Sequence, residues 1–344
     1  MRATVGRARR GHAAAALASV VALGLSVAGA GARSTAAAGS TGVQAVYTPY
    51  VDMTLRSDPM LPAIQRQTGA HALTLAFVIA TAGRCQPSWG GTTPLSSAQI
   101  HHEVAAVRRA GAGVIVSFGG AGGTDLSQAC ASASSLSAAY RQAVTSYAAN
   151  QVDFDLEGKA LASTAGAQRE ILAIAQLEQW AHSQHRSLEV SLTLPVGPTG
   201  LPAQSLRTLR WARADHARID LVNIMAMDFG NSTAPPGKNT MAGYAIEAAQ
   251  ATARQLQKAM PGATASRLGV TVMIGINDVR DELFKIADAK TLLRYGQSHH
   301  LGRLAIWSAA RDRPCPKPTH SAQDNCSGVP QSPDQFSHTF DAFG

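Results

Sequence analysis

The chain has 344 residues, of which 45% are hydrophobic and 15% charged, and its formal net charge is +8. Five arginines lie within the first 42 residues, so the remainder carries 25 basic against 22 acidic residues, a net charge of about +3. No basic run with interleaved aromatic residues occurs, which argues against a nucleic-acid partner and favours a neutral ligand.

The first 42 residues predict an export signal. Basic residues precede an apolar stretch over 13–27 and the small residues Ala28-Gly29-Ala30, the pattern of a secretory signal peptide. We assign residues 1–30 to the signal peptide and 31–42 to a disordered leader. No second apolar run is long enough to span a membrane, so we expect a secreted protein; an uncleaved anchor is the alternative.

From residue 43 onward, short apolar runs alternate with segments of helical period. The runs, which predict strands, cover 43–50, 72–81, 113–119, 152–157, 187–195, 219–228, 268–276 and 303–308. Helices are expected over 97–110, 135–149, 165–185, 202–214, 240–259 and 287–299. Eight repeats predict an α/β fold, a single (β/α)8 TIM barrel over residues 43–344. The alternative, a doubly wound open sheet, usually carries a glycine-rich loop where Tyr47-Thr48-Pro49-Tyr50 stands.

The fourth predicted strand has one acidic face. Asp153, Asp155 and Glu157 occupy alternate positions, and apolar residues occupy the positions between them. Anionic neighbours and a dry setting raise a carboxyl pKa, so one member of the stack can act as a general acid. For this segment alone, an exposed sheet face or a site for a hard cation are the alternatives.

Four cysteines predict two disulfides in an oxidising compartment, and no Cys-x-x-Cys pair indicates zinc. Three pairings are possible, and we expect the nearest-neighbour one. Cys85–Cys130 would then contribute about 4 kcal/mol and Cys315–Cys326 about 3 kcal/mol on the chain-entropy model.

In a barrel of this kind, functional side chains lie at the C-terminal ends of the strands. Here those ends carry Ser117-Phe118-Gly119-Gly120 on the third strand, Asp153-Phe154-Asp155-Leu156-Glu157 on the fourth, Met225-Ala226-Met227-Asp228 on the sixth and Trp307 on the eighth. In this order and spacing, the four motifs resemble those of the family 18 glycoside hydrolases, the chitinases and endo-β-N-acetylglucosaminidases. The segments 85–91, 273–278 and 307–312 look most like secreted actinobacterial and bacillary chitinases.

The resemblance implies a role for each motif. Glu157 would protonate the glycosidic oxygen, and Asp155 would orient the substrate's acetamide, whose carbonyl attacks the anomeric carbon with overall retention. Asp153 would hold the proton that lets Asp155 reorient. Asp228 with Met227 would contact the N-acetyl group, and Trp307 would form an apolar floor. No cofactor or metal is implied.

Further residues have simpler interpretations. Ser117, Gly119 and Gly120 are expected to be structural, since a tight strand-to-helix transition needs small residues. Tyr47, in the first predicted strand, and Trp89, beside Cys85, are expected substrate contacts. For Trp89, packing against the disulfide is an equal alternative.

Two departures from the family pattern stand out: Asn150-Gln151 precedes the acidic strand in place of Asp-Gly, and Met227 replaces a tyrosine. Only about 25 residues separate the last two strands, which leaves no room for an extra α+β domain and predicts a shallow groove. We therefore expect a monomeric, endo-acting chitinase that cleaves β-1,4 linkages in chitin or N-acetylglucosamine oligosaccharides. An endo-β-N-acetylglucosaminidase acting on N-glycans and a non-catalytic, lectin-like barrel are the alternatives.

Overall fold

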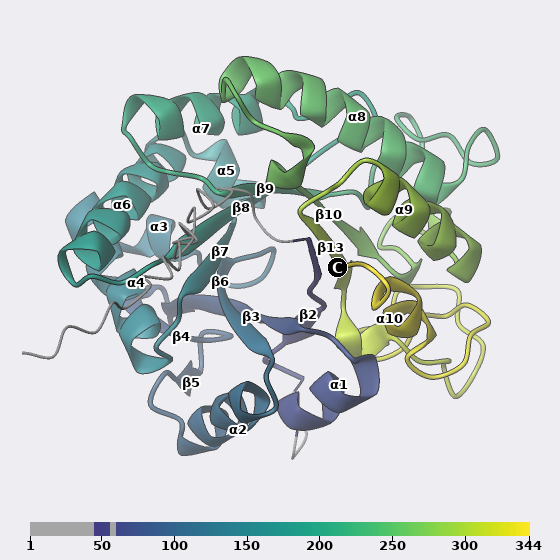
Figure 1. Cartoon of the computed structure of the whole chain (residues 1–344), viewed down its shortest axis with the longest axis horizontal. Helices are drawn as coiled ribbons and strands as arrows, with labels where there is room; N and C mark the ends of the chain where they lie inside the picture. The colour runs from purple at the N-terminus through teal and green to yellow at the C-terminus, as the bar shows by residue number, and fades with distance from the viewer. Residues whose placement is uncertain (1–44, 56–59) are drawn as a thin grey trace, which may run out of the picture. The chain divides into compact units, whose positions relative to one another are not determined.

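The computed structural model describes residues 45–55 and 60–344, so the expected signal peptide and leader lie outside the described residues. Parallel strands form a central barrel, and helices surround it (Figure 1). This arrangement confirms the α/β barrel and excludes the doubly wound sheet. In the described part of the chain, no helix has the length and apolar character needed to cross a membrane.

The strands follow the predicted runs closely, with additions. In chain order they are β1 (Val46–Tyr47), β2 (Tyr50–Asp52), β3 (Ala72–Thr81), β4 (Arg84–Trp89), β5 (Thr93–Pro94), β6 (Gly113–Gly119), β7 (Gln151–Asp155), β8 (Glu189–Pro195), β9 (Leu221–Met225), β10 (Leu268–Met273), β11 (Gly275–Ile276), β12 (Leu283–Phe284) and β13 (Arg303–Trp307). Parallel pairing runs from β3 through β6, β7, β8, β9 and β10 to β13. Strand β4 pairs antiparallel with β3, β5 pairs antiparallel with β4, and β11 pairs with β12 in a separate hairpin.

The first barrel strand is split into two halves that bond to different neighbours. Strand β1 pairs with β13, and β2 pairs with β3, so together they close the barrel. The bridge between them is made by Thr48 N donating to Leu304 O (3.0 Å) and Thr74 N donating to Pro49 O (3.0 Å). Because Pro49 has no N–H to donate, it interrupts regular pairing at this point. The predicted run over 43–50 therefore ended too early, since the strand continues to Asp52.

Helices connect the strands on the outside. They are α1 (Leu61–Thr68), α2 (Ala98–Arg109), α3 (Leu126–Ala129), α4 (Ala133–Ser146), α5 (Gly158–Ala162), α6 (Thr164–Ser183), α7 (Ala203–Ala214), α8 (Met241–Ala259), α9 (Ile286–Ser298) and α10 (Gln335–Phe340), with 3-10 turns η1 (Ala265–Arg267) and η2 (Ala309–Arg311). The six predicted helices are confirmed to within three residues at each end. Several begin at a side-chain cap, as where Ser132 accepts from Ser135 N (3.1 Å) and Thr240 accepts from Gly243 N (3.0 Å).

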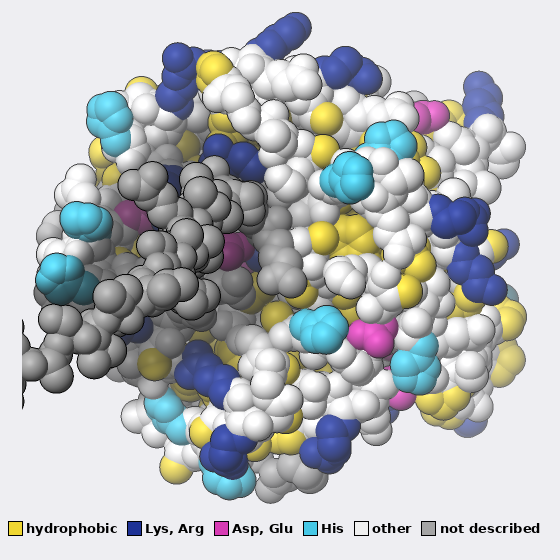
Figure 2. All heavy atoms as spheres, in the orientation of Figure 1, with side chains coloured by type: hydrophobic (Ala, Val, Ile, Leu, Met, Phe, Trp, Pro, Cys, Tyr) yellow, Lys and Arg dark blue, Asp and Glu magenta, His cyan; other side chains and the backbone are white. Residues whose placement is uncertain are grey.

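The core between the barrel and its helices is built from the outward faces of the strands. Phe118 of β6 stacks on Phe154 of β7 with ring centroids 5.2 Å apart, and Tyr140 of α4 packs edge-on to Phe154 at 4.9 Å. These apolar side chains alternate with polar ones that point into the barrel, as the period of a strand requires. On the outer surface drawn in Figure 2, Lys and Arg side chains stand apart around the rim and do not form one basic patch.

Both expected disulfides are present. Cys85 of β4 bonds to Cys130, which follows α3, and Cys315 bonds to Cys326 in the loop after η2. The described residues contain no free cysteine. The nearest-neighbour pairing is thus confirmed.

Candidate active site

The acidic face of β7 points into the barrel and climbs towards its C-terminal end. Asp153 is fully buried, Asp155 is 5% exposed, and Glu157 is half-buried. Strand β7 ends at Asp155, yet Glu157 keeps an extended backbone (φ −141°, ψ −178°) before α5 begins. The alternation therefore continues past the strand, and the three carboxylates lie on one side in a row from the barrel interior to its rim.

Asp153 is the most thoroughly hydrogen-bonded carboxylate of the stack. Its Oδ2 accepts from the hydroxyls of Ser117 (2.7 Å) and Tyr50 (3.0 Å), and its Oδ1 accepts from those of Ser191 (2.6 Å) and Thr193 (2.8 Å). Four hydroxyl groups from three strands, β2, β6 and β8, thus converge on one side chain. A carboxylate has enough lone pairs to accept all four hydrogen bonds, so the network holds the Asp153 side chain in one orientation.

Asp155 and Glu157 have the opposite character. Burial raises the pKa of Asp155 well above its ordinary value, and the charges of Glu157, Asp153 and Asp125 raise it further. Oδ1 of Asp155 is buried without a hydrogen-bond partner in the structure. Burial is also the main cause that raises the pKa of Glu157, followed by the charge of Asp228. Burial and neighbouring negative charge thus act in the same direction on the upper two carboxyls and favour their protonated forms.

Asp228 faces Glu157 from the loop after β9. It adopts a left-handed backbone conformation (φ +49°), and its Oδ1 accepts from Val279 N at 2.9 Å. Burial raises the pKa of Asp228 as well. Glu282 fixes the same loop by accepting from the backbone N–H groups of Phe229 (3.1 Å) and Gly230 (2.7 Å). Met227, which precedes Asp228, is half-buried.

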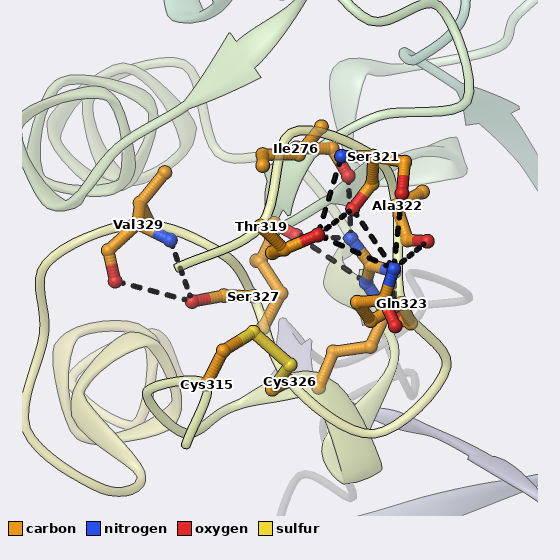
Figure 3. Close-up of a disulfide and its surroundings, with 11 residues drawn as sticks. Ile276, Cys315, Thr319, Ser321, Ala322, Gln323, Cys326, Ser327 and Val329 are labelled. Carbon is orange, nitrogen blue, oxygen red and sulfur yellow. Dashed lines mark hydrogen bonds between the residues drawn. A yellow bond between two sulfur atoms is a disulfide. The ribbon is translucent and has the colours of Figure 1, made fainter. Parts of the chain in front are cut away.

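The segment that holds Asp228 is itself anchored by a buried arginine. Arg311 is 1% exposed and donates from Nη2 to the carbonyl oxygens of Ile274 (3.0 Å) and Ile276 (2.6 Å). Its Nη1 donates to the carbonyl oxygen of Gln323, which lies within the loop closed by the Cys315–Cys326 disulfide. Figure 3 shows this loop folding from the disulfide back over Ile276. Burial lowers the pKa of Arg311 to about 10, so it remains a cation at neutral pH.

Aromatic rings line the barrel mouth beside the acidic row. Trp307, at the end of β13, is half-buried and stacks on Phe77 of β3 with centroids 5.6 Å apart and planes at 15°. Tyr50 lies 6.1 Å from Trp307 and 6.2 Å from Phe77. A cavity of about 330 Å³ opens next to these rings, with Asp52 and Trp307 among its lining residues. Trp307 is thus placed where it can underlie a bound ring.

The glycines after β6 allow the backbone to pass close to β7. A Cβ atom on Gly119 would lie 2.1 Å from the carbonyl oxygen of Asp155, and one on Gly120 would lie 2.5 Å from the Phe77 ring. Both glycines also have positive φ. Their placement agrees with a structural role, whereas Ser117 does more, because its hydroxyl donates to Asp153.

Two expected substrate contacts are wrong. Tyr47 is 1% exposed, points away from the acidic row, stacks on Phe340 of α10 at 5.8 Å and donates to Ser337 Oγ (3.0 Å). Trp89 is 1% exposed and donates from Nε1 to the hydroxyl of Tyr147 at 2.9 Å. Both side chains belong to the hydrophobic core, so neither can lie against a ligand.

Residues that the sequence did not single out complete the site. Asp153 accepts hydrogen bonds from Tyr50, Ser191 and Thr193. Phe77 stacks on Trp307. Arg303 lies 4.0 Å from the carboxylate of Asp153. Tyr50 had a signal, because it ends the first apolar run after Pro49. The others had none, since a hydroxyl or an aromatic residue within an apolar run is ordinary in a strand. In the part of the chain that the structure describes, no group of three or more His, Cys, Asp or Glu side chains could hold a metal ion.

Two curated proteins that resemble this chain in sequence are chitinases by name. No protein-family model matches the sequence. The probable bifunctional chitinase/lysozyme of Escherichia coli K12 is 33% identical over 278 residues, which cover 78% of this chain and 31% of that protein. Endochitinase 11 of Metarhizium anisopliae is 32% identical over 279 residues, which cover 78% of this chain and 53% of that protein. The chain thus spans about a third and about half of the length of these two relatives.

Solved structures extend the similarity to the fold. The catalytic domain of the hyperthermophilic chitinase from Pyrococcus furiosus is 30% identical, with a TM-score of 0.75 over 86% of this chain and 93% of that one. Catalytic-site mutants of active domain 2 of the chitinase from the same organism, complexed with chito-oligosaccharides, give a TM-score of 0.76 at 29% identity.

Proposed function

We propose that this chain, which belongs to the chitinase-like family 18 of glycoside hydrolases, hydrolyses the β-1,4 linkages between N-acetylglucosamine units as an endo-acting chitinase. One observation carries the proposal. Glu157 lies half-buried at the rim with a raised pKa, beyond Asp155 and on the same side of the extended segment that continues β7. A raised pKa favours the protonated form of a carboxyl, which is the form that a general acid requires.

The reaction follows from this arrangement. Glu157 donates its proton to the glycosidic oxygen, and the leaving sugar departs. The carbonyl oxygen of the substrate's own acetamide attacks the anomeric carbon, and Asp155 stabilises the positive charge of the resulting oxazolinium ion. Water then attacks the anomeric carbon from the opposite face, the bond from that carbon to the acetamide oxygen breaks, and the ionised Glu157 takes a proton from the attacking water. Two inversions at the anomeric carbon retain its configuration. Asp153 and Asp155 share a strand with Glu157, in contrast to enzymes whose two carboxyls flank the sugar.

The surrounding residues fit a sugar substrate. We assign the exposed face of the Trp307 ring, which stacks on Phe77, to the floor under the sugar, and Asp228 with Met227 to contacts with the acetamide. Between β10 and β13 the chain forms only the small β11–β12 hairpin and α9, so no additional domain is inserted there to deepen the groove. We infer an open groove that admits a chain at internal positions, which suits endo-type cleavage of soluble or amorphous material.

The first test compares substrates and variants. Wild type should cleave chitooligosaccharides, whereas Glu157→Gln should lose about 10²- to 10⁴-fold in rate. Glu247→Gln, on the exposed face of α8, is the matched control and should retain activity. Undiminished cleavage by Glu157→Gln would remove this residue from the mechanism. Release of glycans from a high-mannose glycoprotein, without cleavage of chitooligosaccharides, would favour an endo-β-N-acetylglucosaminidase instead.

Two further measurements address the acetamide and the cleavage mode. Oligomers with free amines in place of the N-acetyl groups at the cleaved sugar should resist hydrolysis, because the internal nucleophile is missing. A hexamer should yield products of several lengths from the earliest times. Dimers alone, released processively from crystalline chitin, would contradict the endo mode.

We also propose that the mature protein is secreted and monomeric, with residues 1–30 as signal peptide, 31–42 as leader and 43–344 as the catalytic barrel. The two disulfides suit an oxidising compartment. Mass spectrometry of the protein from culture medium, together with sedimentation analysis, tests the processing, the location and the oligomeric state.

A further inference from the structure

The cavity of about 330 Å³ beside Trp307 carries a carboxylate that the proposed mechanism does not use. This carboxylate belongs to Asp52, the last residue of β2. Tyr50 and Asp52 occupy alternate positions of β2, so their side chains lie on the same side of the strand. Tyr50 reaches Asp153 in the barrel interior, and Asp52 lies one step nearer to the rim. The cavity therefore adjoins the place assigned to the cleaved sugar.

The Asp52 carboxylate is fixed through one oxygen and open at the other. Oδ1 accepts from the backbone N–H of Thr54 (2.8 Å) and from the Thr54 hydroxyl (2.7 Å), which uses both of its lone pairs. No described residue donates to Oδ2, and this oxygen is not one of the buried polar atoms, since Asp52 is only half-buried. Oδ2 is thus free to accept from a ligand in the cavity.

Close glycine contacts give the cavity its shape. Gly90 has a left-handed backbone (φ +56°), and a Cβ atom there would lie 2.5 Å from Cγ2 of Thr54. A Cβ atom at Gly123 would lie 2.4 Å from Cδ1 of Ile79, which lines the same cavity. The volume is at the lower end of the range of about 300–1,000 Å³ that is usual for small-ligand sites, so it suits one sugar unit.

The charge of Asp52 has no counter-ion in this cavity. The described residues that line it include no Lys, Arg or His, and none of the ion pairs between described residues involves Asp52. A hydroxyl or amide N–H group of a neutral sugar can bond Oδ2 but leaves the charge uncompensated. An ammonium group supplies both the hydrogen bond and the opposite charge, and hydrogen bonds between charged groups are the stronger kind.

We propose that this cavity is a subsite for a glucosamine unit, whose ammonium group donates to Oδ2 of Asp52, and that the substrate class is partially deacetylated chitin. The inference rests on the proposed function, in which the cleaved sugar over Trp307 must keep its acetamide because the acetamide is the nucleophile. The two requirements fall on different sugars of one chain: an acetylated unit at the cleaved position and a deacetylated unit beside it.

The kinetic test uses N-acetylglucosamine oligomers that carry one glucosamine unit, placed at each position in turn, at a mildly acidic pH where the amine is protonated. One placement should raise kcat/KM about 10-fold over the fully acetylated oligomer, mainly through a lower KM. Asp52→Asn should bring this ratio close to one, because the amide keeps an acceptor for Thr54 and loses the charge. Glu247→Gln removes a charge from the exposed face of α8 and should preserve the ratio.

A structural role for Asp52, confined to the turn after β2, would give a different result. The ratio of the two kcat/KM values would then be the same in wild type and in Asp52→Asn. That outcome, in a variant whose circular dichroism shows it folded, overturns the proposal. The preference should also shrink as salt is added, since mobile ions screen a charge pair that is open to solvent. A preference that salt does not change would contradict the charge as its cause.

A binding measurement separates this inference from the proposed function. In Glu157→Gln, which should not turn the oligomers over, calorimetry should show the preferred mixed oligomer binding about 10-fold more tightly than the fully acetylated one. The difference should disappear when Asp52→Asn is added. Equal affinities before that addition overturn the inference, even if wild type cleaves acetylated oligomers. If wild type cleaves no oligomer at all, the proposed function fails, and the affinities of wild type and Asp52→Asn still decide on Asp52.

Discussion

The hydroxyl of Tyr50 donates to Oδ2 of Asp153 across 3.0 Å, and the two residues are 103 positions apart in the chain. The contact joins the strand that closes the barrel to the strand that carries the acidic row. Tyr50→Phe removes this hydrogen bond to a charged group, which should lower kcat/KM by about 10- to 100-fold. Tyr47→Phe is the matched control: its hydroxyl bonds Ser337 in the core, so it should affect stability and spare the rate. Equal rate losses in both variants would contradict the assignment of Tyr50 to the site.

The pH profile should respond to Asp228. The charge of Asp228 raises the pKa of Glu157, so Asp228→Asn, which removes that charge, should lower the pKa of Glu157. Because the protonated form of Glu157 is the active acid, the basic limb of kcat/KM against pH should move to lower pH. Asp281→Asn, on an exposed part of the neighbouring loop, should leave the limb in place. A basic limb that stays fixed in Asp228→Asn would show that another group sets it.

Stability should fall as the pH rises through the mildly acidic range, and Glu178 is one cause. Its pKa is raised from 4.5 to about 7, mainly by burial, although Arg218 lies 3.5 Å away. A raised folded-state pKa stabilises the protein fully below the unfolded value, and this contribution is lost as the pH passes through about 7. Glu178→Gln should therefore reduce the change of Tm between pH 4.5 and about 7. The corresponding change in the free energy of unfolding over this range should become smaller by up to about 3 kcal/mol. An unchanged slope would refute this cause.

The two disulfides should differ in what they support. The Cys315–Cys326 disulfide closes a loop that contains Gln323. Arg311 donates hydrogen bonds both to Gln323 in this loop and to Ile276, in the segment that leads to the loop contacting Asp228. Replacing Cys315 and Cys326 by serine should therefore lower kcat/KM and cost about 3 kcal/mol in unfolding free energy. Replacing Cys85 and Cys130 should cost about 4 kcal/mol and leave kcat/KM of the folded fraction near that of wild type. Denaturant titration and steady-state kinetics on both variants measure the two effects, and a larger loss of kcat/KM in the second variant would contradict the assignment.

Gly119 should not tolerate a side chain. A Cβ atom there meets the carbonyl oxygen of Asp155 at 2.1 Å, and the backbone φ of +92° is strained for an L-residue. Gly119→Ala should destabilise the protein by about 2 kcal/mol or more and displace Asp155. Gly122→Ala, whose Cβ would meet nothing within 4 Å, is the control in the same loop. Comparable Tm values for the two variants would contradict this account.

The order of strands and helices could be predicted from the sequence because each element carries its own period and its own boundaries. The acidic row could be predicted too, since alternation along one strand is a local property that Asp153, Asp155 and Glu157 display without help from the rest of the chain. Both disulfides follow from proximity along the chain.

Contacts between strands could not be predicted in the same way. The first strand changes its pairing partner around Pro49, and Tyr50, not Tyr47, is the tyrosine of this strand that reaches the acidic row. An indole ring such as that of Trp89 could stack on a sugar, but β4 directs this side chain into the core, where it contacts Tyr147. Arg303 begins a strand, where an arginine is normally solvated, and only the closed barrel buries it. Each of these outcomes depends on a partner that is distant in sequence.

The split first strand has a consequence for how the protein reaches its active form. Val46–Asp52 must find Arg303–Trp307, more than 250 positions away, before the barrel can close, and pairings of such high sequence separation form slowly. Tyr50, Phe77 and Trp307 meet across this seam. A refolding chain can therefore gain most of its helices and central strands while the floor of the site is still absent. Recovery of activity after dilution from denaturant should lag behind recovery of helicity, and the delay would time the closing of the seam itself.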